Sequence, residues 1–131
     1  MNNKLKVKDI PDVWNQKYKD YLGIEPPNYS LGVLQDVHWF SGYFGYFPSY
    51  ILGNFYAAQI YYTLKREKPN YADIVASGNW KEINEWFKEK IFIHSAIYNP
   101  QELIYIVTDE NLKSEYFIDY LNEKYKYIYE I

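Results

Sequence analysis

The hydrophobic positions of this chain recur every three or four residues, a spacing that predicts amphipathic helices. The first such segment follows Pro11 and ends at Gly23, because proline fits a first helical turn and glycine readily adopts the left-handed conformation that ends a helix. The longest segment begins at Pro48 or Ser49 and runs to about Lys65. It is apolar on almost every side, which predicts a helix buried in a larger body.

Shorter helical patterns occupy the rest of the chain and are separated by Gly, Pro or Asn. Two of these patterns span residues 30–39 and 71–76, and three more begin at Asn79, at Asn99 and at Lys113 or Ser114. No alternating strand pattern of any length interrupts them. The sequence therefore predicts an all-α fold of about six or seven helices, in a single domain that covers residues 1–131.

Composition narrows the class of protein. With 48% hydrophobic and 21% aromatic residues, the 131-residue chain is too apolar for disorder. A net charge of -3 predicts no nucleic-acid partner, and the lack of cysteine excludes disulfides and thiolate metal sites. Residues 1–6 lack the apolar core of a signal peptide and no apolar run is long enough to span a bilayer, so we expect a cytoplasmic protein without a membrane partner.

Polar side chains with chemical potential gather between glycines in residues 32–50. Gln35, Asp36 and His38 precede a loop with two glycines, which permit backbone angles that other residues avoid and bring Tyr46 close to whatever the loop covers. From the residue types alone, Tyr46 is one of 17 tyrosines, and a packing role is the commoner one. His38 alone would more often be a hydrogen-bonded structural histidine.

The stretch Gly32-x-x-Gln35-Asp36-x-His38-Trp39 matches the GxxQDxHW motif and thereby resembles the thermostable carboxypeptidase Taq family of zinc metallocarboxypeptidases. Further segments resemble the same family in the same order, namely 45–50, 52–59, 102–104, 120–121 and 124–125. The resemblance covers nearly the whole chain. It implies the C-terminal helical part of a zincin-like metallocarboxypeptidase, because family members are about four times longer.

In that family an HExxH helix and a downstream Glu bind the zinc, and an Arg-containing motif holds the substrate carboxylate. We expect all of these upstream of Met1. Neither of the two histidines in this chain, His38 and His94, belongs to an HExxH pattern, in which two histidines one helical turn apart bind zinc. The resemblance therefore implies no metal ligand and no cofactor in this chain, and zinc in the full-length family.

The resemblance also implies roles for the polar cluster, on condition that a missing zinc half completes the site. Tyr46 and His38 would stabilise the negatively charged oxygen of the transition state. Gln35 would bind the substrate backbone, and Asp36 would orient His38 or pair with the missing Arg. For Asp36, a helix cap or a salt bridge is about as common a role.

The chain departs from the family at several positions. Phe40 replaces a small residue, Phe92 and Ser95–Ala96 replace an HxHGR-like run, and Asp109 stands where Gly is usual. Such changes are typical of drift after a catalytic constraint relaxes. Gln59, inside the long helix, is expected to bond to backbone rather than to a ligand.

Three interpretations remain. We favour a shortened, degenerate family member that is inactive alone and forms a homodimer to bury exposed apolar surface. Alternatively, the chain is one subunit of a split zinc carboxypeptidase, whose catalytic half is another polypeptide and which releases C-terminal amino acids from peptides. A third possibility is an artificially shortened chain or a misread gene start. Whether the isolated chain is an enzyme stays open.

Overall fold

The computed structural model describes residues 5–130 and builds them from seven α-helices and four short 3-10 turns, with no strand among these residues. The all-α prediction is therefore confirmed. The chain divides into two compact units, Met1–Phe47 and Pro48–Ile131, and each is described by itself. The single domain over residues 1–131 stays a prediction. Within the described part of the chain, no helix combines the length and apolar character needed to cross a membrane.

The N-terminal unit begins with a 3-10 turn, η1 (Val7–Asp9), followed by the helix α1 (Ile10–Leu22). Gly23 ends α1 with a φ of 68°, and its N–H donates to the Lys19 carbonyl, as the sequence predicted. Asp9 directly precedes α1, and its side chain forms no capping hydrogen bond. Asp9 itself has helical backbone angles, whereas a capping residue needs an extended backbone.

The helix predicted for residues 30–39 is wrong. Three short turns take its place: η2 (Tyr29–Leu31), η3 (Val33–Gln35) and α2 (Val37–Phe40). The breaks fall at Gly32, with φ -120° and ψ -119°, and at Asp36, with φ -81° and ψ 93°, because neither pair of angles is helical. A Cβ on Gly32 would lie 3.2 Å from the Asn28 carbonyl oxygen, which is closer than most Cβ contacts, so glycine fits this close approach without displacing its neighbour.

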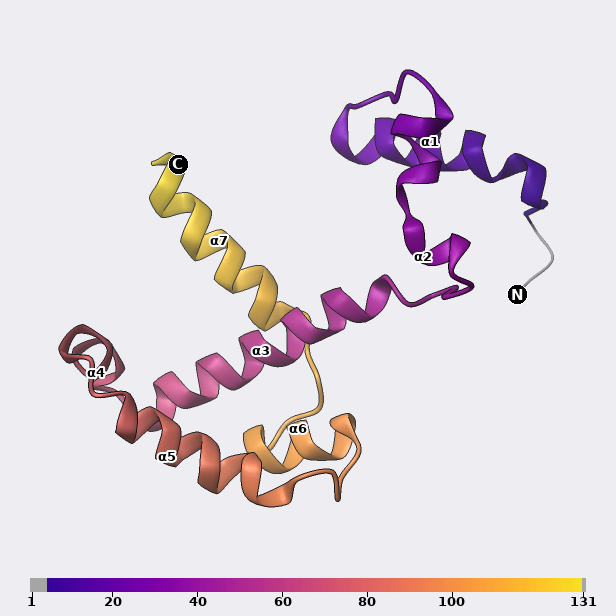
Figure 1. Cartoon of the computed structure of the whole chain (residues 1–131). Helices are drawn as coiled ribbons and strands as arrows, with labels where there is room; N and C mark the ends of the chain where they lie inside the picture. The colour runs from indigo at the N-terminus through magenta and orange to yellow at the C-terminus, as the bar shows by residue number, and fades with distance from the viewer. Residues whose placement is uncertain (1–4, 131) are drawn as a thin grey trace. The chain divides into compact units, whose positions relative to one another are not determined.

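The C-terminal unit is organised around α3, which runs from Pro48 as predicted (Figure 1). Its helices are α3 (Pro48–Glu67), α4 (Tyr71–Ser77), α5 (Trp80–Lys90), α6 (Pro100–Thr108) and α7 (Glu115–Tyr129), with the 3-10 turn η4 (Phe92–His94) after α5. The helix α3 contacts both α6 and α7, and α4 contacts α5. Asn99 starts α6 with a capping box completed by Glu102, which confirms the predicted boundary.

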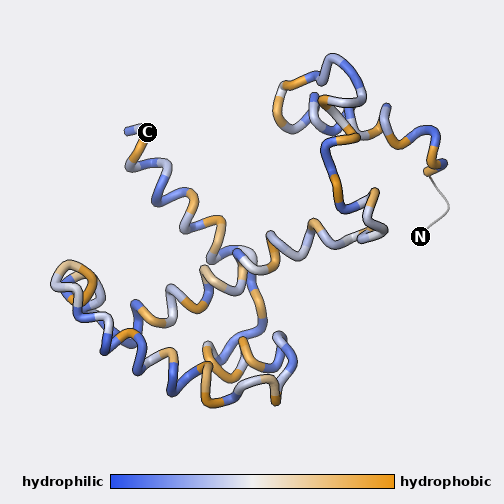
Figure 2. The backbone as a smooth tube through the Cα atoms, in the orientation of Figure 1, coloured by the Kyte–Doolittle hydropathy of each residue, from blue (hydrophilic) through white to orange (hydrophobic). Residues whose placement is uncertain are grey.

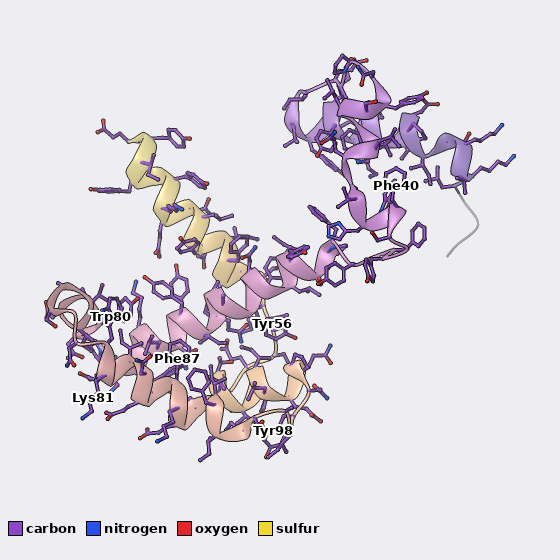
Figure 3. The ribbon with its side chains drawn as sticks, in the orientation of Figure 1. Phe40, Tyr56, Trp80, Lys81, Phe87 and Tyr98 are labelled. Atoms are coloured by element: carbon purple, nitrogen blue, oxygen red, sulfur yellow. The ribbon has the colours of Figure 1, made fainter. Side chains whose placement is uncertain are left out.

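A small apolar core joins α3, α4, α5 and α6. Its buried members are Leu64, Ile74, Ile83, Trp86 and Val107. Phe87 packs against this core from α5 (Figure 3). The indole of Trp86 donates to the Glu67 carboxylate over 2.8 Å, so the one polar atom of this buried ring is satisfied.

Gln59 is fully buried in α3 and fixes the connection between α6 and α7. Its amide nitrogen donates to Thr108 Oγ1 over 2.9 Å and to the Asn111 carbonyl over 3.1 Å. Its amide oxygen accepts from the Lys113 N–H over 2.9 Å. The prediction that Gln59 bonds to backbone is confirmed, because two of these partners are main-chain groups.

The prediction of a helix buried on nearly every side is met only in the second half of α3. Ala58, Gln59, Thr63 and Leu64 are its buried residues. Toward its start, Leu52 stays 46% exposed. The helix α7 has no buried residue, and Figure 2 shows hydrophobic and hydrophilic residues alternating along it. Much apolar surface of this unit is therefore left open.

Candidate functional site

A carboxylate and an imidazole meet at the start of α2. Asp36 caps this short helix, because its Oδ1 accepts a hydrogen bond from the His38 backbone N–H over 3.0 Å. The same oxygen lies 2.7 Å from His38 Nδ1. Both side chains are about 20% exposed. The helix cap expected as one alternative for Asp36 is therefore present, and the same carboxylate also lies where it can orient His38, whereas pairing with an Arg stays a prediction.

The glycine-containing loop folds back over α2 and brings aromatic rings to the same histidine. Gly42 and Gly45 have φ of 77° and 78°, which few other residues adopt. The Tyr43 N–H donates to the His38 carbonyl over 2.8 Å. The His38 ring centroid then lies 5.4 Å from that of Tyr46.

Phe47 is a contact that the sequence did not predict. Its ring meets the edge of the His38 ring at a centroid distance of 5.4 Å. The only sequence feature that could have pointed to Phe47 is its position directly before Pro48. A phenylalanine side chain has no acidic, basic or nucleophilic group. Together Asp36, Tyr46 and Phe47 surround His38 from three positions near it in the chain.

Gln35 ends the preceding turn, η3, and its amide nitrogen donates to the Ser30 carbonyl. Its contacts are thus local to the stretch before Asp36, and the side chain is exposed. A role for Gln35 in binding the substrate backbone stays a prediction.

Two positions at which the sequence departs from the family have a left-handed backbone. Ser95, which follows η4, has φ 48° and ψ -127°, and Asp109, which ends α6, has φ 59° and ψ 23°. Positive φ favours glycine, so the second case explains why glycine is usual there. The nearby His94 lies in the C-terminal unit, with its ring 5.4 Å from that of Tyr98.

No group of three or more His, Cys, Asp or Glu side chains is placed to hold a metal ion within the described residues 5–130. The donors there do not form a metal centre of the kind that the family resemblance implies.

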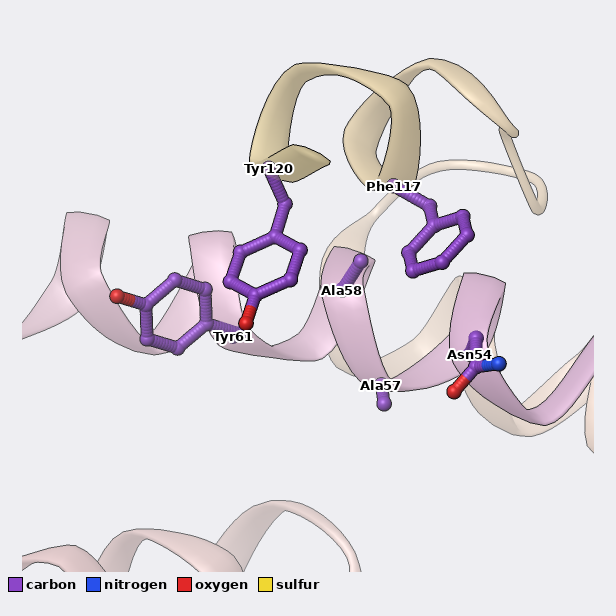
Figure 4. Close-up of a pocket in the computed structure, with 6 residues that line it drawn as sticks. All are labelled: Asn54, Ala57, Ala58, Tyr61, Phe117 and Tyr120. Atoms are coloured by element: carbon purple, nitrogen blue, oxygen red, sulfur yellow. The ribbon is translucent and has the colours of Figure 1, made fainter. Parts of the chain in front are cut away.

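The C-terminal unit carries a concavity of about 440 Å³ between α3 and α7 (Figure 4). Its lining residues are Asn54, Ala57, Ala58, Tyr61, Phe117 and Tyr120. Ala57 and Ala58 lie on α3, and the rings of Tyr61, Phe117 and Tyr120 contribute most of the remaining lining. Its lining is mainly apolar and includes no carboxylate, histidine, lysine or cysteine.

Comparison with known proteins identifies the family. The family model for the carboxypeptidase Taq (M32) metallopeptidases matches residues 1–125. The chain belongs to this family. The family resemblance drawn from the GxxQDxHW motif is thereby confirmed.

Relatives and solved structures extend the match. Carboxypeptidase 1 of Bacillus subtilis is 44% identical over 128 residues, which are 98% of this chain and 26% of the relative. Thermostable carboxypeptidase 1 of Pyrococcus furiosus is 40% identical, over 95% of this chain and 25% of its own length. The structure of the M32 carboxypeptidase from Deinococcus radiodurans superposes with a TM-score of 0.89 at 32% identity, over 98% of this chain and 26% of that one. This M32 chain therefore spans about a quarter of the length of the relatives it matches.

Proposed function

We propose that this chain is one part of a zinc metallocarboxypeptidase and has no peptidase activity by itself. The proposal rests on one combination of observations: a family match over almost the whole chain that spans about a quarter of its relatives, with no metal-holding group among the described residues. Hydrolysis of a peptide by this family's route needs a metal, which would come from the remaining part.

The cluster at α2 favours a second, conditional function, that of a subunit in a split enzyme. Attack of water on a peptide carbonyl places negative charge on its oxygen, which nearby hydrogen-bond donors stabilise. The rings of Tyr46 and His38 have their centroids 5.4 Å apart. The Tyr46 hydroxyl and a ring nitrogen of His38 are therefore suited to donate to one such oxygen. Zinc bound by the remaining part would supply the Lewis acid.

A complementation experiment tests both statements. The purified chain is mixed with the region of the Bacillus subtilis carboxypeptidase 1 that lies outside the match, and zinc and a blocked dipeptide with a free C-terminal carboxylate are added. We expect release of the C-terminal amino acid in the mixture and none from the chain with zinc alone. Release by the chain alone would refute its inactivity, and a stable but inactive complex would refute the split enzyme.

Matched variants sharpen the result. Tyr46→Phe removes one hydroxyl donor and should lower kcat of the complemented enzyme by about 10²-fold or more. Tyr43 lies in the same loop, with its ring 5.8 Å from that of Tyr46 and its side chain exposed. Tyr43→Phe should leave kcat within about twofold, and an equal loss in both variants would argue for a general effect on the loop.

Alone, the chain is proposed to form a homodimer in the cytoplasm. Large apolar side chains with exposed fractions of 70% at Phe40, 74% at Ile97 and 87% at Tyr127 support self-association. Light scattering should give a mass near twice the 15.9 kDa of one chain. A monomer at micromolar concentration would contradict the dimer. Elemental analysis should find no stoichiometric zinc.

A further inference from the structure

Two hydrogen-bond donors compete for one oxygen at the Asp36–His38 pair. The His38 backbone N–H, which always carries its proton, lies 3.0 Å from Asp36 Oδ1. The ring nitrogen Nδ1 lies 2.7 Å from the same atom. An ionised carboxylate oxygen can only accept, so the short contact to Nδ1 needs a proton on the ring nitrogen.

We infer that Asp36 holds His38 in the tautomer with its proton on Nδ1, and that Asp36 is therefore a positioning residue for His38. In the opposite tautomer, the lone pair of Nδ1 would face a lone pair of Oδ1 at hydrogen-bond distance, which is repulsive. The neutral ring consequently keeps its lone pair on Nε2.

The surroundings of the ring favour this single orientation. Rotation of the His38 ring by 180° about its Cβ–Cγ bond would place Cδ2 instead of Nδ1 against Asp36 and remove the 2.7 Å contact. The rings of Tyr46 and Phe47, each with its centroid 5.4 Å from that of His38, pack beside it. Asp36 is itself fixed, because it caps α2 through the backbone N–H.

The tautomer changes what His38 can do at a substrate, an implication that rests on the proposed function. A neutral His38 would only accept a hydrogen bond through Nε2. To donate to a developing oxyanion from that nitrogen, His38 must be an imidazolium, whose charge Asp36 would balance. Tyr46 would then be the neutral donor of the pair and His38 the charged one.

Nitrogen NMR on the chain labelled with ¹⁵N-histidine tests the tautomer directly. The spectrum is recorded over a rising pH series until the histidine signals stop changing, which identifies the neutral rings. The chain has two histidines, so a His94→Gln variant assigns both sets of signals. We expect the His38 Nδ1 signal in the range of a protonated nitrogen and the Nε2 signal in that of an unprotonated one. The reverse pattern would overturn the inference.

A variant pair then tests the role of Asp36. Asp36→Ala should move His38 toward the Nε2–H tautomer, whereas Asp12→Ala, an exposed carboxylate on α1 in the same unit, should leave it unchanged. An unchanged tautomer in a folded Asp36→Ala variant would overturn the role. The wild-type spectrum decides the tautomer even if that variant unfolds. The measurement uses no zinc, peptide or second polypeptide, so it can succeed or fail independently of the complementation.

Discussion

Replacement of Gln59 by methionine tests what holds the connection between α6 and α7. Methionine has nearly the shape of glutamine but neither donates nor accepts strongly. The substitution Gln59→Met therefore removes the hydrogen bonds of a fully buried amide and leaves little cavity. We expect a loss of stability without a change of fold.

The magnitude follows from the partners. Three short bonds, of 2.9 Å to Thr108, 3.1 Å to Asn111 and 2.9 Å to Lys113, are lost together with a longer one of 3.4 Å to the Glu110 carbonyl. At about 1 kcal/mol for each net hydrogen bond, the free energy of unfolding should fall by about 3 kcal/mol. Asn111 and Lys113 are exposed residues, so water can replace part of the loss and an outcome of about 2 kcal/mol is consistent.

Urea denaturation followed by circular dichroism measures this loss, and hydrogen exchange locates it. The Lys113 amide should exchange faster in Gln59→Met, because its acceptor has gone. Gln101, an exposed glutamine on α6, provides the matched control, and Gln101→Met should change the free energy of unfolding by less than about 0.5 kcal/mol. A comparably small effect of Gln59→Met, or unchanged exchange at Lys113, would refute the reasoning.

Three further substitutions test backbone strain and charge. Ser95→Gly should stabilise the chain by about 1 kcal/mol and Asp109→Gly by about half as much, because aspartate tolerates positive φ better than serine; a loss of stability in denaturant would contradict the strain. Burial raises the pKa of Glu67, but hydrogen bonds from Trp86 and a lysine outweigh it and lower the pKa below its usual value. The ionised carboxylate therefore stabilises the fold above the unfolded-state pKa of about 4.3, and this contribution is lost as the pH falls through the lower folded-state value. Glu67→Gln should flatten the acid branch of a stability–pH curve, whereas Glu85→Gln, in a 3.9 Å surface pair, should leave its slope intact.

Local chemistry explains which elements the sequence could predict. Gly23 and Gly78 both end helices in the left-handed conformation, with φ of 68° and 69°. Asn99 begins α6 through two hydrogen bonds with Glu102, the third residue of that helix. Each signal lies within one turn of the boundary it sets. Helix starts and ends could therefore be located without knowledge of the rest of the fold.

The failures came from contacts that a periodic pattern does not contain. Residues 30–39 have helical spacing, but the backbone angles of Gly32 break the helix, and a Cβ at this position would lie 3.3 Å from Asn15 Oδ1 on α1. Similarly, the apolar start of α3 reads as a buried helix, yet Leu52 remains largely exposed. The hydropathy pattern identifies an apolar helix face, but it does not identify the element that packs against that face.

The candidate site shows the same difference between contacts that are local in sequence and contacts between distant residues. Asp36 reaches His38 across two positions of the sequence, and Tyr46 and Phe47 return to it through one glycine-containing loop. These contacts all lie within residues 36–47. A metal centre, by contrast, needs at least three converging donors, and the described residues bring no such group together. The described contacts of the α2 cluster are thus local in sequence, whereas its proposed catalytic use also needs a metal centre.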